Sequence, residues 1–192
     1  MIMKQIRVLF TTAILLLLSA CTVTPSAESE FYMLSSSPLP HRQIDLNSEL
    51  VIVGPLTMAD YLKRASLVTP ISGHKYEVSK LEQWAGNLDS EFQTALVKNL
   101  SALDEQRVYV RYPSFLSTQS HYNLRVDVLR FDAGLNGLVR LEASWALVDK
   151  SKKVHAGGHF SKTKQAGSSI ESVVATQSEL LKQLSQEVLK AM

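Results

Sequence analysis

Residues 122–147 read YNLRVDVLRFDAGLNGLVRLEASWAL and hold the strongest strand pattern in the chain. Apolar side chains alternate with polar ones over 122–128 and again over 139–147, which is typical of strands with one buried face. The alternation slips by one residue at Leu129, where a β-bulge would account for the change of phase. Asn136-Gly137 lies between the two runs and favours a tight hairpin turn. The stretch therefore predicts two long antiparallel strands.

Further apolar runs extend this hairpin into a larger sheet. After a turn, residues 154–164 return as a third strand that Gly157-Gly158 loosens. Shorter runs rich in β-branched and aromatic residues predict strands at 31–34, 49–56, 66–71, 74–78 and 107–112. We expect residues 57–64 to form a loop or short turn, and residues 80–86 to lead into a helix.

Two helices are indicated by apolar side chains at three- and four-residue spacing, one over 88–103 and one over 169–190. Asn87 is suited to cap the first helix, and Ser168 with Glu171 has the spacing of a capping box for the second. Together these elements predict an α+β fold, in which the two amphipathic helices pack on one face of a largely antiparallel sheet.

The N-terminus has the pattern of a lipoprotein signal peptide over residues 1–20. Lys4 and Arg7 precede an apolar run over 8–18, which is too short to span a bilayer. Leu18-Ser19-Ala20-Cys21 then places small residues before the only cysteine of the chain. Cleavage before Cys21 would leave an acylated N-terminal cysteine, and several acyl chains make a stable membrane anchor. The alternatives are an ordinary signal peptide with a chance cysteine and an uncleaved helix, which the polar residues after Cys21 disfavour.

Removal of residues 1–20 leaves 172 of the 192 residues, which is enough for one domain with a hydrophobic core. We divide them into a polar tether at 21–30 and a single α+β domain at 31–192. The signal peptide holds two of the 20 Lys and Arg and none of the 18 Asp and Glu, so the mature chain is neutral. A neutral domain argues against nucleic-acid binding, and acylation of Cys21 leaves no thiol for a disulfide.

The residue after Cys21 bears on the address of the lipoprotein. Gram-negative lipoproteins that stay in the inner membrane commonly carry Asp at that position, whereas this chain has Thr22. We therefore predict the periplasmic face of the outer membrane, with the domain held close by its tether. A flexible tether of about ten residues typically spans less than about 20 Å.

The sequence contains none of the common catalytic, phosphate-binding or metal-binding motifs that we sought. We expect no catalytic residues, no metal and no cofactor. Two alternatives of another kind stay open. His155 and His159, with His121 nearby, could form a metal site, and Asp127 with Asp132 could serve as the carboxylate pair of an envelope hydrolase.

Several aromatic residues are candidates for either packing or partner contact. Trp145 belongs to the apolar face of a predicted strand, so we assign it to the core. Trp84 and Tyr61 lie in predicted connecting segments, where a large aromatic needs a core position or a partner, and we favour the core. Phe31-Tyr32 directly follows the tether, and an edge strand is favoured there over a free docking peptide.

The order of these features resembles a known family. The lipobox and tether are followed by Phe31-Tyr32-Met33-Leu34, an apolar strand over 50–53, Asp60-Tyr61-Leu62, a hairpin, and Trp84 with Leu88 opening a helix. This succession resembles the ABC-type transport auxiliary lipoproteins of the PqiC/YmbA type, over nearly the whole mature chain.

The resemblance implies an accessory role in moving lipids or other hydrophobic solutes between envelope membranes. Its implied partners are an MCE-domain protein that spans the periplasm and an inner-membrane component. We therefore expect a non-enzymatic lipoprotein that docks such a protein at the outer membrane through a sheet edge, the Tyr61 loop or the face near Trp84. The candidate docking residues are Phe31, Tyr32, Asp60, Tyr61, Leu62 and Trp84. A multimeric partner would favour a homo-oligomer. The alternative is a lipid-binding carrier or chaperone that holds an acyl chain between sheet and helices.

Overall fold

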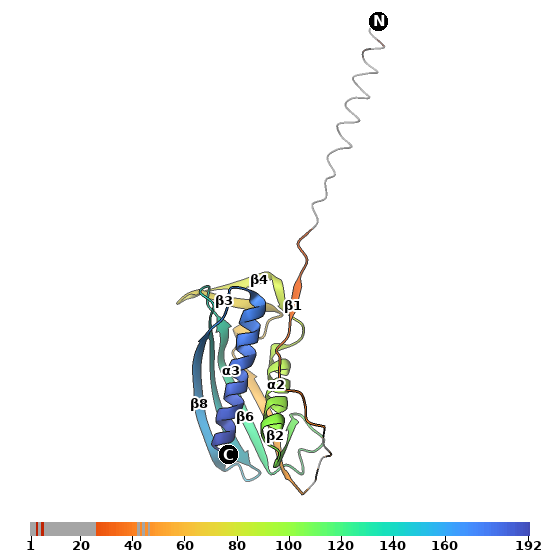
Figure 1. Ribbon diagram of the computed structural model, residues 1–192, viewed down its shortest axis with the longest axis vertical. Helices are drawn as coiled ribbons and strands as arrows, with labels where there is room; N and C mark the ends of the chain where they lie inside the picture. The colour runs from red at the N-terminus through yellow and green to blue at the C-terminus, as the bar shows by residue number, and fades with distance from the viewer. Residues whose placement is uncertain (1–2, 4, 6–25, 42, 44, 46) are drawn as a thin grey trace.

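The computed structural model describes residues 3, 5, 26–41, 43, 45 and 47–192, and it has an α+β fold (Figure 1). In chain order the elements are β1 (Glu30–Tyr32), β2 (Glu49–Met58), the 3-10 turn η1 (Asp60–Leu62), β3 (Ser66–Ser72), β4 (Lys75–Trp84), α2 (Leu88–Leu103), β5 (Arg107–Arg111), β6 (Tyr122–Ala133), β7 (Leu138–Asp149), β8 (Val154–Gln165) and α3 (Ile170–Lys190). The predicted fold class is confirmed. Cys21, most of the signal peptide and the first half of the tether lie outside the described residues.

The strands form two sheets. The larger has the order β5-β2-β6-β7-β8, and the smaller has the order β1-β4-β3. Strands β6, β7 and β8 form the expected antiparallel meander, whereas β2 runs parallel to both of its neighbours. This parallel pairing was not foreseen, and it follows from the connections. The chain leaves β2 through the β3–β4 hairpin and α2 before it returns as β5, which is the crossover that parallel strands require.

The meander has the local features that its sequence predicts. The register of β6 against β7 shifts between Val128 and Arg130, which confirms the bulge and leaves Leu129 exposed. Gly137 adopts a φ of 72° in the turn between β6 and β7. That left-handed conformation is readily available to glycine and strained for most other residues. The turn and the bulge together fix which residues of β6 and β7 face each other.

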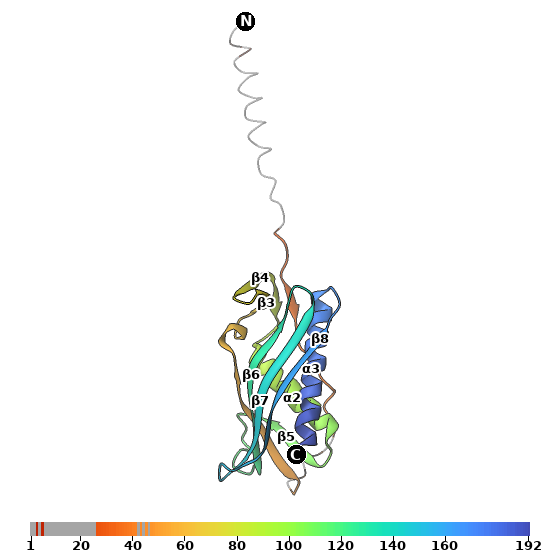
Figure 2. The same cartoon turned by 90° about the vertical axis from the view of Figure 1, so that its left-hand side faces the viewer.

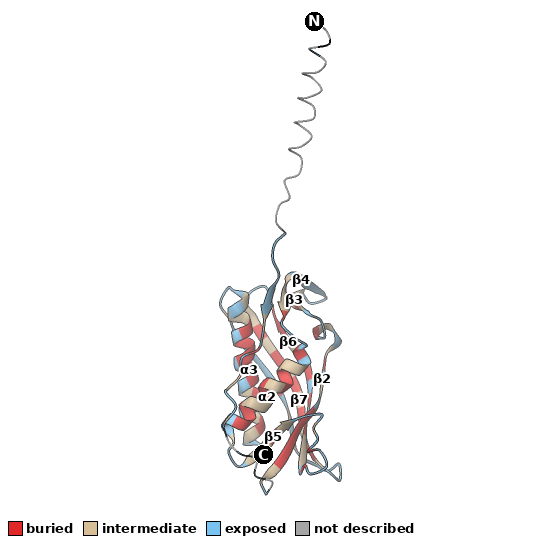
Figure 3. Cartoon of the chain, turned by 90° about the vertical axis from the view of Figure 1, so that its right-hand side faces the viewer, coloured by how far each residue is buried: buried red, intermediate tan, exposed pale blue. Residues whose placement is uncertain are grey.

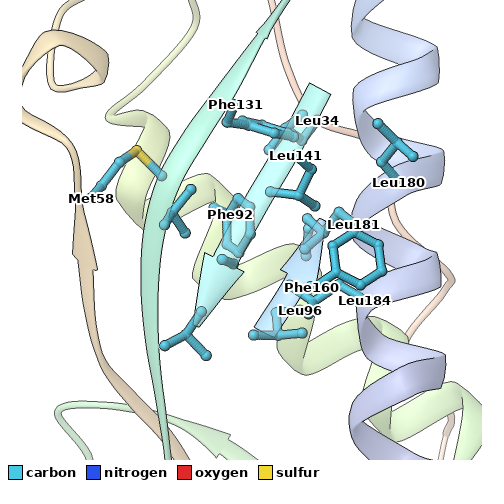
Figure 4. Close-up of a cluster of buried hydrophobic side chains, with 14 of the residues drawn as sticks. Leu34, Met58, Phe92, Leu96, Phe131, Leu141, Phe160, Leu180, Leu181 and Leu184 are labelled. Carbon is cyan, nitrogen blue, oxygen red and sulfur yellow. The ribbon is translucent and has the colours of Figure 1, made fainter. Parts of the chain in front are cut away.

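Both helices cover the same face of the larger sheet, as predicted. Helix α2 packs on β2 and β5, and α3 packs on β6, β7 and β8. Figure 2 shows the meander in front with the helices behind it, and Figure 3 shows the buried residues gathered between the two layers. Phe92 of α2 meets Phe131 of β6 edge to face, with ring centroids 5.3 Å apart. Figure 4 shows the surrounding apolar side chains of the sheet and both helices.

Three local expectations differ from the structure. We expected residues 80–86 to lead directly into α2, but strand β4 continues to Trp84. A hydrogen bond from the Trp84 backbone N–H to Ala65 O holds this end of the strand. Helix α3 is capped by Ser169, whose hydroxyl accepts from the Ser172 backbone, and not by Ser168. Asn87 occupies the cap position of α2, but its side chain makes no capping hydrogen bond.

Among the described residues, neither helix has the length and apolar character needed to cross a bilayer.

Candidate functional site

One end of the molecule gathers most of the segments that the sequence analysis singled out. The tether enters β1 there, beside the β3–β4 hairpin (Figure 1). We call this the tether end and define it as β1, η1, the β3–β4 hairpin, the β6–β7 turn over 134–137, and residues 166–170 leading into α3. Two hollows border this end; Leu62 and Trp84 line one of them, whereas Phe31, Tyr32, Asp60 and Tyr61 line neither.

Phe31 and Tyr32 lie in the edge strand β1. Tyr32 is paired in register with Trp84 of β4, and its carbonyl accepts from the Ala85 N–H at 2.8 Å. Phe31 and Met33 are each 64% exposed, so β1 presents apolar side chains to its surroundings. The Tyr32 hydroxyl donates to the Glu30 carboxylate, and this hydrogen bond raises the pKa of Tyr32 to about 12.

The chain after β1 is fastened to both helices. The backbone N–H of Leu34 donates to the Glu91 carboxylate of α2 at 3.3 Å, and that of Ser35 donates to the Ser178 hydroxyl of α3 at 3.0 Å. Ser37 N–H then reaches the side-chain oxygen of Asn99 at 2.9 Å. A force on the tether is therefore passed directly to α2 and α3.

Asp60, Tyr61 and Leu62 form η1, and each faces a different environment. The Asp60 side chain is 96% exposed and forms an ion pair with Lys63 at 2.7 Å. Leu62 is buried in the core. The Tyr61 ring lies between these extremes and packs on Tyr76 of β4, with centroids 5.0 Å apart. Of the three residues, Asp60 has the most exposed side chain, which is paired with Lys63.

A polar network holds Tyr61 in place. Its hydroxyl donates to Asp132 Oδ2 at 2.7 Å, and Asp132 forms an ion pair with Arg130 at 3.1 Å. Asp132 is buried, and Tyr61 and Arg130 supply its carboxylate with hydrogen bonds in place of those lost to water. Burial, followed by the hydrogen bond to Asp132, raises the pKa of Tyr61 above its usual range. Burial acts to lower the pKa of Arg130, but its hydrogen bond to Asp132, together with the attraction of the Asp132 charge and of Tyr76 and Tyr61, raises that pKa overall.

Trp84 and Leu62 line a cavity of about 500 Å³ beneath β3. Its other walls come from the end of β6, the β6–β7 turn, the end of β8 and the first two turns of α3. The lining residues are Leu62, Ser66, Leu67, Val68, Thr69, Trp84, Phe131, Ala133, Gly134, Leu135, Asn136, Gly137, Gln165, Ala166, Gly167, Ser168, Ile170, Val173 and Gln177. Because none of them carries a charge, we call this space the uncharged cavity.

A second hollow of about 440 Å³ adjoins the uncharged cavity and shares Gly134, Leu135 and Asn136 with it. The other lining residues come from the β3–β4 hairpin and from the strands on either side of the turn. Arg130 and Arg140 are its two charged residues, so we call it the arginine hollow. Within the part of the chain that the structure describes, Arg140 forms no ion pair.

The histidines of the alternative metal site have separate partners. His155 hydrogen-bonds to Asp149 at 2.8 Å, and His159 to the Ser144 hydroxyl at 2.9 Å. His121 accepts from the Leu50 N–H through Nδ1. Across the described ranges, no three His, Cys, Asp or Glu side chains gather in a way that could hold a metal ion.

The two carboxylates of the alternative hydrolase site are also apart. Asp127 is exposed and accepts from the Thr57 hydroxyl at 2.6 Å, whereas Asp132 is buried in the Tyr61 network. Asp132 is five residue steps after Asp127 along β6, which separates them by roughly 16 Å. That exceeds the spacing at which paired carboxylates cooperate in glycoside hydrolysis.

Comparison with known proteins identifies the family. Residues 32–189 match the family of ABC-type transport auxiliary lipoprotein components. The chain belongs to this family. A comparison with curated protein sequences finds no match.

Two solved structures have a fold similar to that of this chain. A crystal structure of an uncharacterized protein has a TM-score of 0.73 at 21% identity, covering 85% of this chain and 98% of the other. The protein XCC0632 from Xanthomonas campestris, of the family DUF330, has a TM-score of 0.65 at 18% identity, covering 83% and 92%. At these identities the likeness concerns the fold alone.

Three side chains around the hollows were missed or misjudged from the sequence. Arg130 and Arg140 were not singled out from the sequence, although a count back from the Asn136-Gly137 turn could have placed them at one end of the hairpin. Gln177 was likewise not considered, because it interrupts the apolar stripe of α3. It is buried beside the uncharged cavity, and its amide nitrogen donates to Phe131 O at 3.2 Å.

Proposed function

We propose that this auxiliary lipoprotein is held at the periplasmic face of the outer membrane by acyl chains on Cys21. There it docks the MCE-domain protein that spans the periplasm in a lipid or hydrophobic-solute transport system. Its family supports a membrane-anchored auxiliary component of a transport system. The outer-membrane address is supported by Thr22 after the lipidated cysteine, where retained lipoproteins commonly carry Asp.

The geometry of the tether end carries this proposal. Glu30 is nine residue steps after Cys21, so a fully extended tether keeps the start of β1 within at most about 32 Å of the anchor. A transport protein that reaches the outer membrane therefore meets the tether end close to the bilayer. Phe31 and Asp60 are exposed there, and apolar anchors beside charged residues are typical of a protein interface.

The proposed role is non-enzymatic. Asp132 is occupied by Arg130 and Tyr61, and His155 by Asp149. A general base needs a free position beside a substrate. These contacts favour structural roles for the two residues, and they support docking over the hydrolase alternative.

Photo-crosslinking of the full chain in its own bacterium tests the docking surface. A photoreactive amino acid replaces Asp60 or Phe31 at the tether end, and Lys153 in the β7–β8 turn serves as the control position. We expect the two tether-end positions to give an adduct that contains an MCE-domain protein, and the control position to give none. Adducts with a second copy of the lipoprotein alone would contradict docking of that partner.

Membrane fractionation tests the address independently. The wild-type chain is expected in the outer-membrane fraction, with its N-terminal cysteine acylated. A Thr22→Asp variant is expected to move toward the inner-membrane fraction, whereas a Thr22→Asn variant of matched size should stay. Wild-type protein in the inner-membrane fraction would contradict the proposed outer-membrane location, and it would leave the crosslinking result unaffected.

A further inference from the structure

We propose that the tether end binds a single-chain amphiphile with an anionic head group. The acyl chain occupies the uncharged cavity, and the carboxylate or phosphate lies between Arg130 and Arg140 in the arginine hollow. This inference goes beyond docking, because it assigns the lipoprotein a ligand of its own.

The size and lining of the uncharged cavity fit an acyl chain. Its volume of about 500 Å³ lies within the range of about 300–1,000 Å³ that is usual for small-molecule sites. Large apolar side chains come from three of its walls, with Leu67 and Trp84 from the smaller sheet, Phe131 from β6, and Ile170 and Val173 from α3, whereas the β8 wall is the uncharged polar Gln165. A charged group placed here would lose its hydration without gaining a partner. The lining therefore selects an uncharged, apolar part of a ligand.

The arginine hollow supplies the complementary charge. Arg130 is partly neutralised by Asp132, but Arg140 has no ion-pair partner among the described side chains. Glu142 lies opposite Arg130 in the register of β6 and β7, and it does not line the hollow. A guanidinium donates two parallel hydrogen bonds to a carboxylate or phosphate, so an anionic head group fits this position.

The two spaces meet at the β6–β7 turn, and this shared wall makes one ligand span both. Gly134, Leu135 and Asn136 line the uncharged cavity on one side and the arginine hollow on the other. Leu135 is 71% exposed at the junction, where an acyl chain would cover it. The junction belongs to the tether end, so a lipid of the anchoring membrane lies within the reach of the tether.

Tryptophan fluorescence tests the position of the chain, because Trp84 lines the uncharged cavity and Trp145, the other tryptophan, does not. The full-length lipoprotein is purified from membranes and reconstituted into phosphatidylcholine vesicles. Trp145→Phe leaves Trp84 as the sole reporter, and Trp84→Phe leaves Trp145. We expect 9,10-dibromostearate to quench Trp84 saturably and to leave Trp145 nearly unchanged, since bromine quenches at contact range. Unbrominated stearate controls for indirect effects.

Two results of the quenching experiment would overturn the proposal. An unquenched Trp84, or equal quenching of the two tryptophans, means that no chain enters the uncharged cavity. Stearate binding also raises the unfolding temperature of the wild-type chain if the ligand prefers the folded state. This second measurement keeps the test valid if one of the single-tryptophan variants folds poorly, and an unchanged unfolding temperature counts against binding.

A charge variant tests the head group. Arg140→Gln is expected to weaken dibromostearate binding about tenfold, because a charge-assisted hydrogen bond is lost. Arg125→Gln is the matched control, since Arg125 lies on the same strand as Arg130 but outside both hollows. Equal affinities of the two variants overturn the assignment of the head group.

The source of the ligand is settled by a second arm of the same experiment. Vesicles that contain brominated lysophosphatidylglycerol present a single-chain anionic lipid within the bilayer, whereas added dibromostearate also reaches the protein from solution. Quenching of Trp84 by the vesicle lipid alone indicates capture from the membrane. Quenching by added stearate alone indicates a free amphiphile. Quenching by neither overturns the proposal.

Discussion

Helix α3 and strands β6 and β7 build two unlike regions along their length. Toward the C-terminal end of α3, Leu181 and Leu184 pack with Phe92, Leu141 and Phe160, and all five are at most 1% exposed (Figure 4). Toward the N-terminal end of α3, residues of α3, β6 and the β6–β7 turn line the uncharged cavity. We call these the packed half and the open half. The molecule is therefore closely packed in one half and contains a cavity in the other.

The two halves are held together by different forces. The packed half relies on contacts between close-packed apolar side chains, which lose free energy when any volume is removed. The open half is held by directional bonds across its gap, from Tyr61 to Asp132 at 2.7 Å, from Gln177 to Phe131 O at 3.2 Å, and from Ala166 N–H to Gly137 O at 2.9 Å. Hydrogen bonds fix the walls without filling the interior. We infer that stability is concentrated in the packed half and binding in the open half.

The largest expected effect comes from a cavity made in the packed half. Phe92→Ala should lower the free energy of unfolding by about 3–5 kcal/mol, since Phe92 is fully buried and meets Phe131 edge to face. Val173→Ala, which enlarges a space already open, should cost about 1 kcal/mol or less. Urea unfolding of both variants in mild detergent measures the difference. Equal losses would show that the two halves do not differ in packing.

The opposite change, an added side chain, distinguishes the halves with less disturbance. Ala143 lies in the packed region of β7, and Ala133 lines the uncharged cavity at the end of β6. Ala143→Leu should cost about 1–3 kcal/mol through overpacking. Ala133→Leu should change stability by about 0.5 kcal/mol or less. It should also weaken the quenching of Trp84 by dibromostearate. A larger cost for Ala133→Leu than for Ala143→Leu would contradict the open half.

The β6–β7 hairpin, which runs through both halves, is the part of the fold that local sequence patterns predict well. Alternation over 122–128 and 139–147, the bulge at Leu129 and the Asn136-Gly137 turn all act within a few residues, and the structure has each of them. The parallel pairing of β2 with β5 and β6 has no such local signal. It depends on where a crossover through α2 returns the chain, which is a property of the whole topology.

The open half was only partly predictable, for a related reason. Tyr61 was recognisable as a large aromatic in a connecting segment, but its hydrogen-bond partner Asp132 lies 71 residues further along the chain. Asp132 and Arg140 lie opposite each other in the backbone register of β6 and β7. Their place at that end of the hairpin could therefore have been found by counting residues from the turn. The uncharged cavity could not have been found in this way. It lies where β3 passes over β6 and α3, and no spacing in the sequence encodes that approach.

The Tyr61 network gives an intermediate effect, and its pH dependence distinguishes hydrogen bonding from packing. Tyr61→Phe should lower the free energy of unfolding by about 1–2 kcal/mol near pH 8, because Asp132 loses a donor while it stays buried. The raised pKa of Tyr61 means that the folded state keeps its phenol proton more tightly than the unfolded state does. This contribution is complete below about pH 10, the pKa of an unfolded tyrosine, and it is lost as the pH rises further.

Urea unfolding of wild type and Tyr61→Phe between pH 8 and pH 11 measures that difference. The gap between the two proteins should narrow above about pH 10. Tyr109 also has a raised pKa, through burial and then its hydrogen bond to Asp104, but it is present in both proteins and cancels in the comparison. Equal stabilities of the two proteins at pH 8 would mean that Tyr61 acts through ring packing on Tyr76, which phenylalanine retains, and not through its hydroxyl.

The smallest expected effect lies beyond the packed half, in the exposed turn between β7 and β8. Asp149 accepts from His155 at 2.8 Å and from the Ser151 hydroxyl at 2.6 Å, and these bonds, His155 first, hold the pKa of Asp149 well below its usual range. A lowered pKa stabilises the folded state above about pH 4 and loses that effect as the pH falls through the folded-state value. Asp149→Asn should therefore lower the unfolding temperature slightly at pH 7, and the difference from wild type should shrink at pH 2. Because solvent screens this pair, its substitution must cost less than Tyr61→Phe. If Asp149→Asn destabilised the protein more than Tyr61→Phe, polar interactions would stabilise both ends of the meander. The contrast between the packed half and the open half would then be lost.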